Sequence, residues 1–572
     1  MRIDGFTDPQ TNLLDALDEQ LRTLGAHRAL AAVVPFRPAA VDVRLEQRDA
    51  AWVDSSAGRN ALAALAAGGE PFGARFPDER LGRLGELLEC GERDPLATSG
   101  VAAGARWVVN FGDPNTTKAL HVGHLRNIAI GNAVASAAAA LGADVVRQSR
   151  VGDFGRSMGE AMAGYLAYGG GRVPASGVGA GAGAKGDRLI GECYLRYVRS
   201  LPARAAATAD PARDGDAALS RERVVHRDTA EELLERWSAG DPNVALLFDE
   251  VRDWVVDGHA ATYARLGVRV DRTLFESDYL AHAEALVREG LACGAIERGA
   301  DRATLYPTGE EAYPQLLLHR RDGFPTQHLR YVATYDALRP LLDGARTVAV
   351  FGSEWRGLIR SCEALLRRLR PGEEAHPTDN LMHEMVLGDG GAAVKSSRGG
   401  ALLVDDLFER VAAAEPVVGL ARRHGRVDAE QLGRIVLLGF FLGRPLQERM
   451  TVTLEELLDA RRNVGWSLAQ AWARACDPRH DGAPDPEPGD AGYRFVLVQS
   501  QRHRRLLARC VAELELLPFV RFHYHLTRWF AGVQATPRIA RAMRGVLGEG
   551  LAALGLAEPV SAAVPSATGA AA

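Results

Sequence analysis

Lysine is nearly absent from this sequence: only three of its 68 basic residues are lysines, and the others are arginines. Long apolar stretches are missing too, since no run reaches the roughly 18 residues that would predict a membrane span. The six cysteines are scattered and form no Cys-x-x-Cys pair, which speaks against a zinc site or a disulfide framework. The first residues lack the apolar core of a secretory signal. We therefore expect a cytoplasmic protein with reduced thiols, no membrane segment and no bound metal.

The bulk composition is that of a globular protein. The chain has 572 residues, of which 47% are apolar and 25% charged, and this length predicts roughly three or four domains. The net charge of −5 and the isoelectric point near 6.3 argue against a protein that coats nucleic acid or an anionic membrane along its whole surface. A local basic face is compatible with both values.

The segment that best indicates chemistry follows a strand-like run at Arg106–Phe111. It reads Asp113-Pro-Asn-Thr-Thr-Lys-Ala-Leu-His-Val-Gly-His124 and leads into a helical run at Leu125–Val134. A strand, a tight turn and a helix start present backbone N–H groups and the positive end of the helix dipole to an anion. Two imidazoles there can add hydrogen bonds to phosphate oxygens. The pattern favours a nucleotide site, and the alternative is that His121 and His124 only cap the helix.

The three lysines have two interpretations, because chance alone can leave a few among so many arginines. The other interpretation is a need for a compact ammonium that a planar guanidinium cannot mimic. Lys118 lies three residues before His121, and Lys395 lies in the glycine-rich run Val394-Lys-Ser-Ser-Arg-Gly-Gly400. Lys185 lies in a low-complexity stretch and is interpreted as incidental.

The pattern of elements predicts an α/β protein with a Rossmann-type parallel sheet. We expect a small N-terminal α/β module in residues 1–100, a catalytic domain in 101–400 with a disordered insert at about 169–186, and a helical domain in 401–572. Strands are expected at Val145–Val151, Val268–Asp271, Ala303–Tyr306 and Thr347–Phe351.

A basic patch is concentrated in the C-terminal part. Residues 501–545 hold nine arginines, with aromatic residues between them and only Glu513 and Glu515 as acids. Cations paired with aromatic rings suit unpaired RNA bases and their phosphates. The candidate tRNA-binding residues are Arg502, Arg504, Arg505, Arg509 and Trp529. The alternative is an ordinary solvated face above core aromatics.

Several motifs in the same order resemble those of arginyl-tRNA synthetase, a class I aminoacyl-tRNA synthetase, over nearly the whole chain. His121-Val-Gly-His124 resembles the HIGH signature, which other nucleotidylyl transferases share, and Asp113-Pro-Asn-Thr-Thr-Lys118 resembles the lead-in of the arginyl branch. Further matches are Val151-Gly-Asp-Phe-Gly155, Tyr263 to Ser277, and Lys395-Ser-Ser-Arg-Gly399 with Val404-Asp-Asp-Leu407, which resembles a degenerate KMSKS loop. Asn463 to Ala475 and Leu554 to Pro559 resemble the family's all-α anticodon-binding domain, which the resemblance implies for residues 401–572.

The resemblance implies arginine–tRNA ligase activity in protein biosynthesis: Mg-ATP and an amino acid give an aminoacyl-adenylate, and a tRNA then takes the aminoacyl group. ATP is a substrate, no tightly bound cofactor is expected, and the protein is expected to be a monomer. The implied catalytic residues are His121, His124, Lys118, Lys395 and Arg398. His121, Gly123, His124 and Lys395 are implied in ATP binding, and Asn115, Asp153, Glu276, Gln327 and Tyr331 in amino-acid binding.

The match breaks at the side-chain pocket. The family's Tyr-x-x-Arg-Asp segment is replaced here by Gln327-His-Leu-Arg-Tyr331, so an expected aspartate is a tyrosine. A guanidinium favours carboxylates in bidentate register, and Glu276 is left as the obvious partner, with Glu354 as a replacement. Three hypotheses stay open: a housekeeping arginine–tRNA ligase, a paralogue with an altered pocket acting in specialised metabolism, and a non-catalytic tRNA-binding relative.

Overall fold

The computed structural model of the chain describes residues 32–34, 42–44, 102, 104–174, 185–201, 229–299, 301–309, 313–321, 323–372, 378–388, 402–481 and 491–557. The expected N-terminal module therefore lies outside the described residues, except for an antiparallel pair formed by β1 (Ala32–Val34) and β2 (Asp42–Arg44). Lys395, Arg398 and most of the expected insert also lie outside them.

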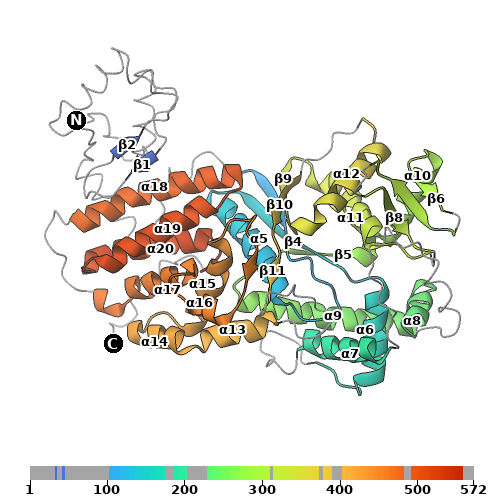
Figure 1. Cartoon of the computed structure of the whole chain (residues 1–572), viewed down its shortest axis with the longest axis horizontal. Helices are drawn as coiled ribbons and strands as arrows, with labels where there is room; N and C mark the ends of the chain where they lie inside the picture. The colour runs from blue at the N-terminus through green and yellow to red at the C-terminus, as the bar shows by residue number, and fades with distance from the viewer. Residues whose placement is uncertain are drawn as a thin grey trace, which may run out of the picture.

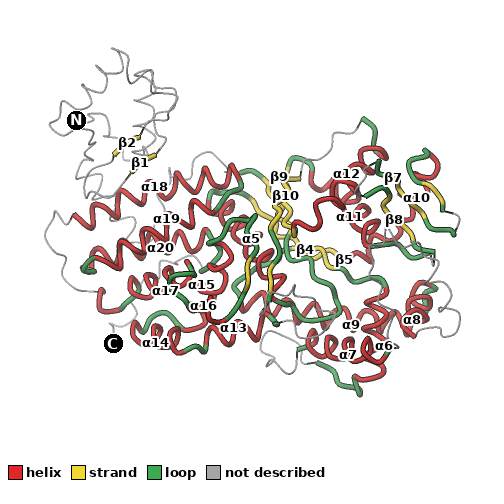
Figure 2. Tube along the Cα trace, in the orientation of Figure 1, coloured by secondary structure: helices red, strands yellow, loops and turns green. Residues whose placement is uncertain are grey.

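A five-stranded sheet with only parallel pairings lies at the centre of the molecule (Figures 1 and 2). Its order is β10-β9-β3-β4-β5. The strands are β3 (Arg106–Asn110), β4 (Asp144–Val151), β5 (Arg272–Phe275), β9 (Ala345–Gly352) and β10 (Thr378–His383). The chain reverses its direction of travel across the sheet between β3 and β9, which is the place where such sheets bind nucleotides. The expected α/β class and parallel sheet are confirmed.

The crossover from β3 to β4 is made by the long helix α5 (Val122–Ala140). Alanine and glycine dominate its sequence, and thirteen of its 19 residues are buried, so it lies directly on the sheet. A side chain at Gly131 would place its Cβ 2.3 Å from Cβ of Phe111. The close packing that only small residues permit therefore holds the middle of α5 against Phe111, the residue that follows β3.

Four helices lie between β4 and β5 and form a separate apolar cluster: α6 (Arg156–Tyr168), α7 (Gly186–Ser200), α8 (Thr229–Ser238) and α9 (Pro242–Arg265). The prediction of a strand at Val268–Asp271 is wrong, since β5 (Arg272–Phe275) begins at the residue that follows this segment. The backbone N–H of Val268 still donates to the carbonyl of Tyr263 at the end of α9. Asp271 joins the sheet only through its hydrogen bonds with Arg147. The alternating apolar residues Val268 and Val270 therefore lie in the segment that connects α9 to β5.

The chain between β5 and β10 forms a smaller α/β layer with its own apolar cluster. A three-stranded antiparallel sheet in the order β6-β7-β8 packs there against helices. Its elements are η2 (Glu276–Tyr279), α10 (Leu280–Ala292), β6 (Glu297–Arg298), β7 (Thr304–Pro307), β8 (Gln315–His319), α11 (Gln327–Leu342), η3 (Ser353–Trp355) and α12 (Arg356–Leu369).

The described residues from 402 onward are almost entirely helical. They form α13 (Val404–Ala412), α14 (Glu415–His424), α15 (Ala429–Leu442), α16 (Leu454–Leu458), α17 (Val464–Ala475), η6 (Pro478–His480), α18 (Ala491–Glu513), α19 (Leu517–Gly532) and α20 (Pro537–Ala553). One exception is β12 (Met450–Thr451), which pairs in parallel with β11 (Val386–Leu387). No helix in the described part of the chain is both long and apolar enough to cross a membrane.

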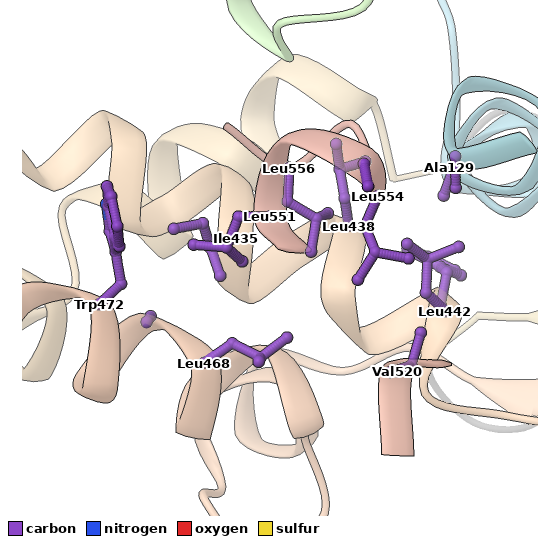
Figure 3. Packing of buried hydrophobic residues seen from close by; sticks show 14 of the residues in the cluster. Ala129, Ile435, Leu438, Leu442, Leu468, Trp472, Val520, Leu551, Leu554 and Leu556 are labelled. Carbon is purple, nitrogen blue, oxygen red and sulfur yellow. The ribbon is translucent and has the colours of Figure 1, made fainter. Parts of the chain in front are cut away.

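The C-terminal helices share one apolar core with α5. Figure 3 shows Ala129 of α5 beside Leu442 of α15, with Leu554 and Leu556, which follow α20, in the same cluster. The side-chain amide of Asn132 on α5 also donates to the carbonyl of Gly555 at 3.0 Å. The helix that begins at the two histidines is therefore held from one side by the sheet and from the other by the helical region.

Candidate nucleotide and amino-acid site

The loops after β3, β4 and β5 meet at the carboxyl edge of the sheet. The loop after β3 runs beside the turn after β4, because the N–H of Gly152 donates to the carbonyl of Pro114 (3.0 Å) and the N–H of Thr116 to the carbonyl of Gly152 (3.1 Å). A Cβ at Gly152 would lie 2.3 Å from Oδ1 of Asn115 and 3.8 Å from Oε2 of Glu276. The structure thus brings the predicted residues Asn115 and Glu276 together around one glycine.

His121 and His124 form a reciprocal cap at the start of α5. The N–H of Gly123 donates to Nδ1 of His121 (3.2 Å), and the N–H of His121 donates to Nδ1 of His124 (3.1 Å). A Cβ at residue 123 would lie 2.9 Å from Cε1 of His121, so this ring position needs glycine. Because each Nδ1 accepts, each neutral imidazole carries its proton on Nε2 and can donate it to an oxygen. The two histidines therefore do cap the helix, and the same hydrogen bonds leave the Nε2–H groups of both rings as donors.

Both rings are electrically neutral at physiological pH. Burial and the nearby charge of Lys118 lower the pKa of His121 to about 4, and burial together with His121 lowers the pKa of His124 well below its usual value. The ring centroids are 4.0 Å apart. Burial also lowers the pKa of Lys118. One cation and two neutral donors therefore meet at the positive end of α5, a set that suits phosphate oxygens.

The loop that carries Lys118 is supported from α9 and α7. Nε2 of buried His259 lies 2.9 Å from the backbone carbonyl of Lys118.

Nζ of Lys185 lies 2.6 Å from Oδ2 of Asp405 on α13 and 2.6 Å from Oγ1 of Thr262 on α9. Lys185 is 6% exposed, so its interpretation as incidental within a disordered stretch is wrong. It is a buried structural lysine.

The chain just after the lysine-bearing run returns to the histidine motif. The N–H of Val122 donates to the carbonyl of Leu402, and the N–H of Val404 donates to the carbonyl of Leu120, both at 3.0 Å. Lys395 and Arg398 lie outside the described residues, so their predicted convergence with Lys118 stays a prediction. Their downstream neighbours are hydrogen-bonded to the segment that holds His121.

Asp153 supports the residue next to Glu276. Its carboxylate accepts from the N–H of Ser277 (2.9 Å) and from Oγ of Ser277 (2.6 Å), and the side chain is fully buried. Burial raises the pKa of Asp153 to about 6, although the hydrogen bonds from Ser277 oppose this shift. Within this structure Asp153 orients the start of η2, and Glu276 with it.

Glu276 faces two arginines of the chain itself. Nε of Arg330 donates to its Oε2 at 2.7 Å, and Nη1 of Arg150 lies 3.9 Å from its Oε1. The guanidinium of Arg150 lies over the ring of Tyr331, 4.5 Å from its centroid, and 3.7 Å from Oδ2 of Asp113. Tyr331, at the position expected to hold an aspartate, thus supplies an aromatic face to a guanidinium.

Gln327, another candidate for this pocket, is exposed in the first turn of α11, three residues before Arg330, and its contact with the amino acid stays a prediction. Asp336, six residues after Arg330 on the same helix, pairs instead with Arg370 (2.8 Å) and His282 (3.0 Å). Glu354 is exposed and folds back over Gly352. In the part of the chain that the structure describes, no hydrogen bond or ion pair joins any of these three side chains to Glu276.

The basic patch lies on α18 and α19. Arg502 lies over the ring of Phe522 and Trp529 packs on Phe495, with centroids 4.4 Å apart. Arg504 pairs with Glu549 of α20 at 2.8 Å, an acid just beyond the window that the sequence pattern covered. Arg505 is half-buried and Arg509 is exposed. RNA contact by this face stays a prediction, and Arg504 is its weakest member because a carboxylate already neutralises it.

Two residues of the site escaped the sequence pattern: Asp113, which the quoted motif contains without a role, and Arg150. Asp113 has a positive φ of 41° and accepts from the N–H of Arg150 (2.8 Å) and from Nδ2 of Asn110 (2.9 Å). The available signal was an arginine at the end of the expected strand, directly before Val151-Gly-Asp-Phe-Gly155. Among the described residues no group of three His, Cys, Asp or Glu side chains is arranged to hold a metal ion.

Comparisons with known proteins agree with this geometry. Residues 98–172 match the family model "tRNA synthetases class I (R), catalytic domain". The arginine–tRNA ligase of Phocaeicola vulgatus is 30% identical over 383 residues, which are 64% of this chain and 62% of that protein. The arginine–tRNA ligase of Treponema pallidum is 28% identical, over 65% of this chain and 60% of that protein. The chain thus spans somewhat less than two thirds of the length of these relatives.

Solved structures show the same fold. The Thermus thermophilus arginyl-tRNA synthetase superposes with a TM-score of 0.60 at 18% identity, covering 95% of this chain and 98% of that one. The Plasmodium falciparum arginyl-tRNA synthetase gives a TM-score of 0.59 at 14% identity, covering 85% and 83%. The chain is therefore similar in sequence to the arginine–tRNA ligases, and its residues 98–172 match the catalytic-domain model of that class I family.

Proposed function

We propose that the chain is an aminoacyl-tRNA ligase built on the plan of the arginine–tRNA ligases. An amino-acid carboxylate attacks the α-phosphate of Mg-ATP, which gives an aminoacyl-adenylate and releases pyrophosphate. The 2′-OH of the 3′-terminal adenosine of a tRNA then takes the aminoacyl group and releases AMP. Arginine is the amino acid that the names of the relatives give.

One observation carries the proposal: two neutral imidazoles with Nε2–H donors stand beside Lys118 at the positive end of α5. Phosphoryl transfer needs positioning and charge stabilisation more than covalent chemistry. The two Nε2–H groups would donate to phosphate oxygens as charge develops on them, and Lys118 would stabilise the leaving pyrophosphate. Lys395 and Arg398 are proposed to share that task.

The amino acid would lie between the loop after β3 and η2. Asn115 is exposed beside Gly152 and is proposed to bind the α-amino group. Asp153 keeps Glu276 in place through Ser277. The tRNA would contact the exposed arginines of α18, with Arg509 as the first candidate.

The test is ATP–pyrophosphate exchange by the full chain, with each amino acid singly, in the presence and absence of tRNA. Exchange that depends on one amino acid supports the proposal. A chain that binds tRNA but supports no exchange with any amino acid would instead be a non-catalytic relative. A second candidate, the same reaction with an amino acid other than arginine, is favoured by the pairing of Glu276 with the chain's own arginines.

A further inference from the structure

We infer that Arg150 determines specificity: its guanidinium takes the place beside Glu276 that a substrate guanidinium would need, so the site selects an amino acid with an uncharged side chain. This inference rests on the proposed function and names the substrate class of the same site. The sequence showed that the pocket is altered, and the structure identifies Arg150 as the residue that changes which side chain the pocket can bind.

The first step concerns Glu276, whose two carboxylate oxygens each face a guanidinium of the chain. Its side chain is 2% exposed, Oε2 accepts from Nε of Arg330 at 2.7 Å, and Oε1 faces Nη1 of Arg150 at 3.9 Å. A guanidinium binds a carboxylate best as a fork that meets both oxygens. A substrate arginine would have to share Oε1 with the nearby guanidinium of Arg150 or displace Arg330 from Oε2.

The second step concerns Arg150, whose guanidinium is buried between two carboxylates and an aromatic ring. Its side chain is 8% exposed, and it is enclosed by Asp113 at 3.7 Å and by the ring of Tyr331 at 4.5 Å. Asp113 itself is fixed by Nδ2 of Asn110 and by the backbone N–H of Arg150. Burial alone would lower the pKa of Arg150, but the carboxylates of Asp113 and Glu276 outweigh it and raise the pKa, so the group stays charged.

The third step is the balance of charge. The two guanidiniums of Arg150 and Arg330 face the two carboxylates of Asp113 and Glu276. A third carboxyl, Asp153, already accepts two hydrogen bonds from Ser277. A substrate guanidinium would bring an uncompensated positive charge next to two like charges in a site of low dielectric, where such repulsion is strong. An uncharged side chain adds no charge and leaves the four groups paired.

The experiment measures kcat/KM for ATP–pyrophosphate exchange with arginine and with each uncharged amino acid, in the presence of total tRNA. For the wild-type chain we expect at least one uncharged amino acid to exceed arginine by about tenfold or more. In Arg150→Gln, the ratio of arginine to that amino acid should rise by about tenfold, because a competing cation is gone.

Arg147→Gln is the matched control, since Arg147 is a buried arginine of the same strand that pairs with Asp271 and not with Glu276. Its ratio should equal that of the wild type. Arginine as the best substrate of the wild-type chain overturns the inference and leaves the proposed function standing, even if Arg150→Gln does not fold. So does a ratio that Arg150→Gln and Arg147→Gln move equally. Absence of exchange with every amino acid overturns the proposed function, and the inference with it.

Discussion

Nζ of Lys185 lies 2.6 Å from Oδ2 of Asp405, although 220 residues separate the two in the sequence. The same ammonium is 2.6 Å from Oγ1 of Thr262 and 3.5 Å from Oδ2 of Asp187. The cluster joins α7, α9 and α13 in a buried position. The three N–H donors of an ammonium point out of any one plane from a single nitrogen, whereas the donors of a guanidinium all lie in one plane. This geometry explains why a lysine persists here in a chain where arginine otherwise dominates.

Replacing Lys185 with methionine should strongly destabilise the chain. The change leaves Asp405 and Asp187 buried without their cation, and breaking a buried pair on one side costs roughly 3–5 kcal/mol. Urea unfolding followed by circular dichroism measures the loss. Arg236→Met is the control: Arg236 is 47% exposed in its pair with Asp241, and such surface pairs contribute only about 0–1 kcal/mol. Equal losses in the two variants would contradict a special role for the buried lysine.

The local pattern of the sequence was enough to predict the parallel sheet around β3, α5 and β4. Alternation in β3 and the glycine turn before α5 are both encoded within a few residues, and the structure confirms that unit. The position of β5 failed because Val268 and Val270 alternate like a strand while they connect α9 to the sheet. The strand propensity of single residues does not show where the preceding helix ends and where the next strand begins.

The pairing inside the pocket could not be predicted, because it depends on side chains from four separate elements. Arg330 on α11 reaches Glu276 in η2, and Arg150 at the end of β4 reaches both Glu276 and Asp113. Only the three-dimensional fold brings these charges within 4 Å of one another. The sequence indicated that Tyr331 replaces an acid, but it contained no sign that Arg150 would stack on that ring.

Replacing His124 with alanine should lower ATP–pyrophosphate exchange by about 100-fold or more, by analogy with the loss of one transition-state donor. The variant also loses half of the reciprocal cap of α5, which costs about 1 kcal/mol of stability. Thr536→Ala separates the two effects, because Thr536 caps α20 through a hydrogen bond from the N–H of Ile539. That control should show a similar stability loss with unchanged exchange. Unimpaired exchange in His124→Ala would remove the histidine from the proposed chemistry.

A methyl group at residue 152 should weaken amino-acid binding more than ATP binding. In Gly152→Ala the Cβ would lie 2.3 Å from Oδ1 of Asn115, so that side chain must move away from its present position. We expect the KM for the amino acid to rise by about tenfold or more, with a much smaller change in the KM for ATP. Gly532→Ala is the matched control, because no atom lies within 4 Å of a Cβ there. Equal increases in both KM values would argue against the placement of Asn115 beside the amino acid.

Asp153 should give the folded chain a pH dependence between pH 4 and 7. Its pKa rises from 3.8 to about 6 on folding, so the folded state holds this proton more tightly than the unfolded state. The stabilisation that this proton provides is complete below pH 4 and is lost as the pH rises through 6. Asp153→Asn removes the titration while an amide oxygen still accepts from Ser277. Between pH 4 and pH 7 the variant should therefore gain roughly 2 kcal/mol relative to the wild type.

Urea unfolding of both chains at four pH values measures this difference. Asp241→Asn serves as the control, since the pKa of Asp241 is lowered, first by its hydrogen bond with Arg236, and its titration falls below this window. The free-energy difference between that variant and the wild type should stay constant from pH 4 to 7. A constant difference for Asp153→Asn as well would mean that its carboxyl is ionised throughout. In that case the hydrogen bonds from Ser277 outweigh the cost of burial, and Asp153 holds the start of η2 as a charged acceptor.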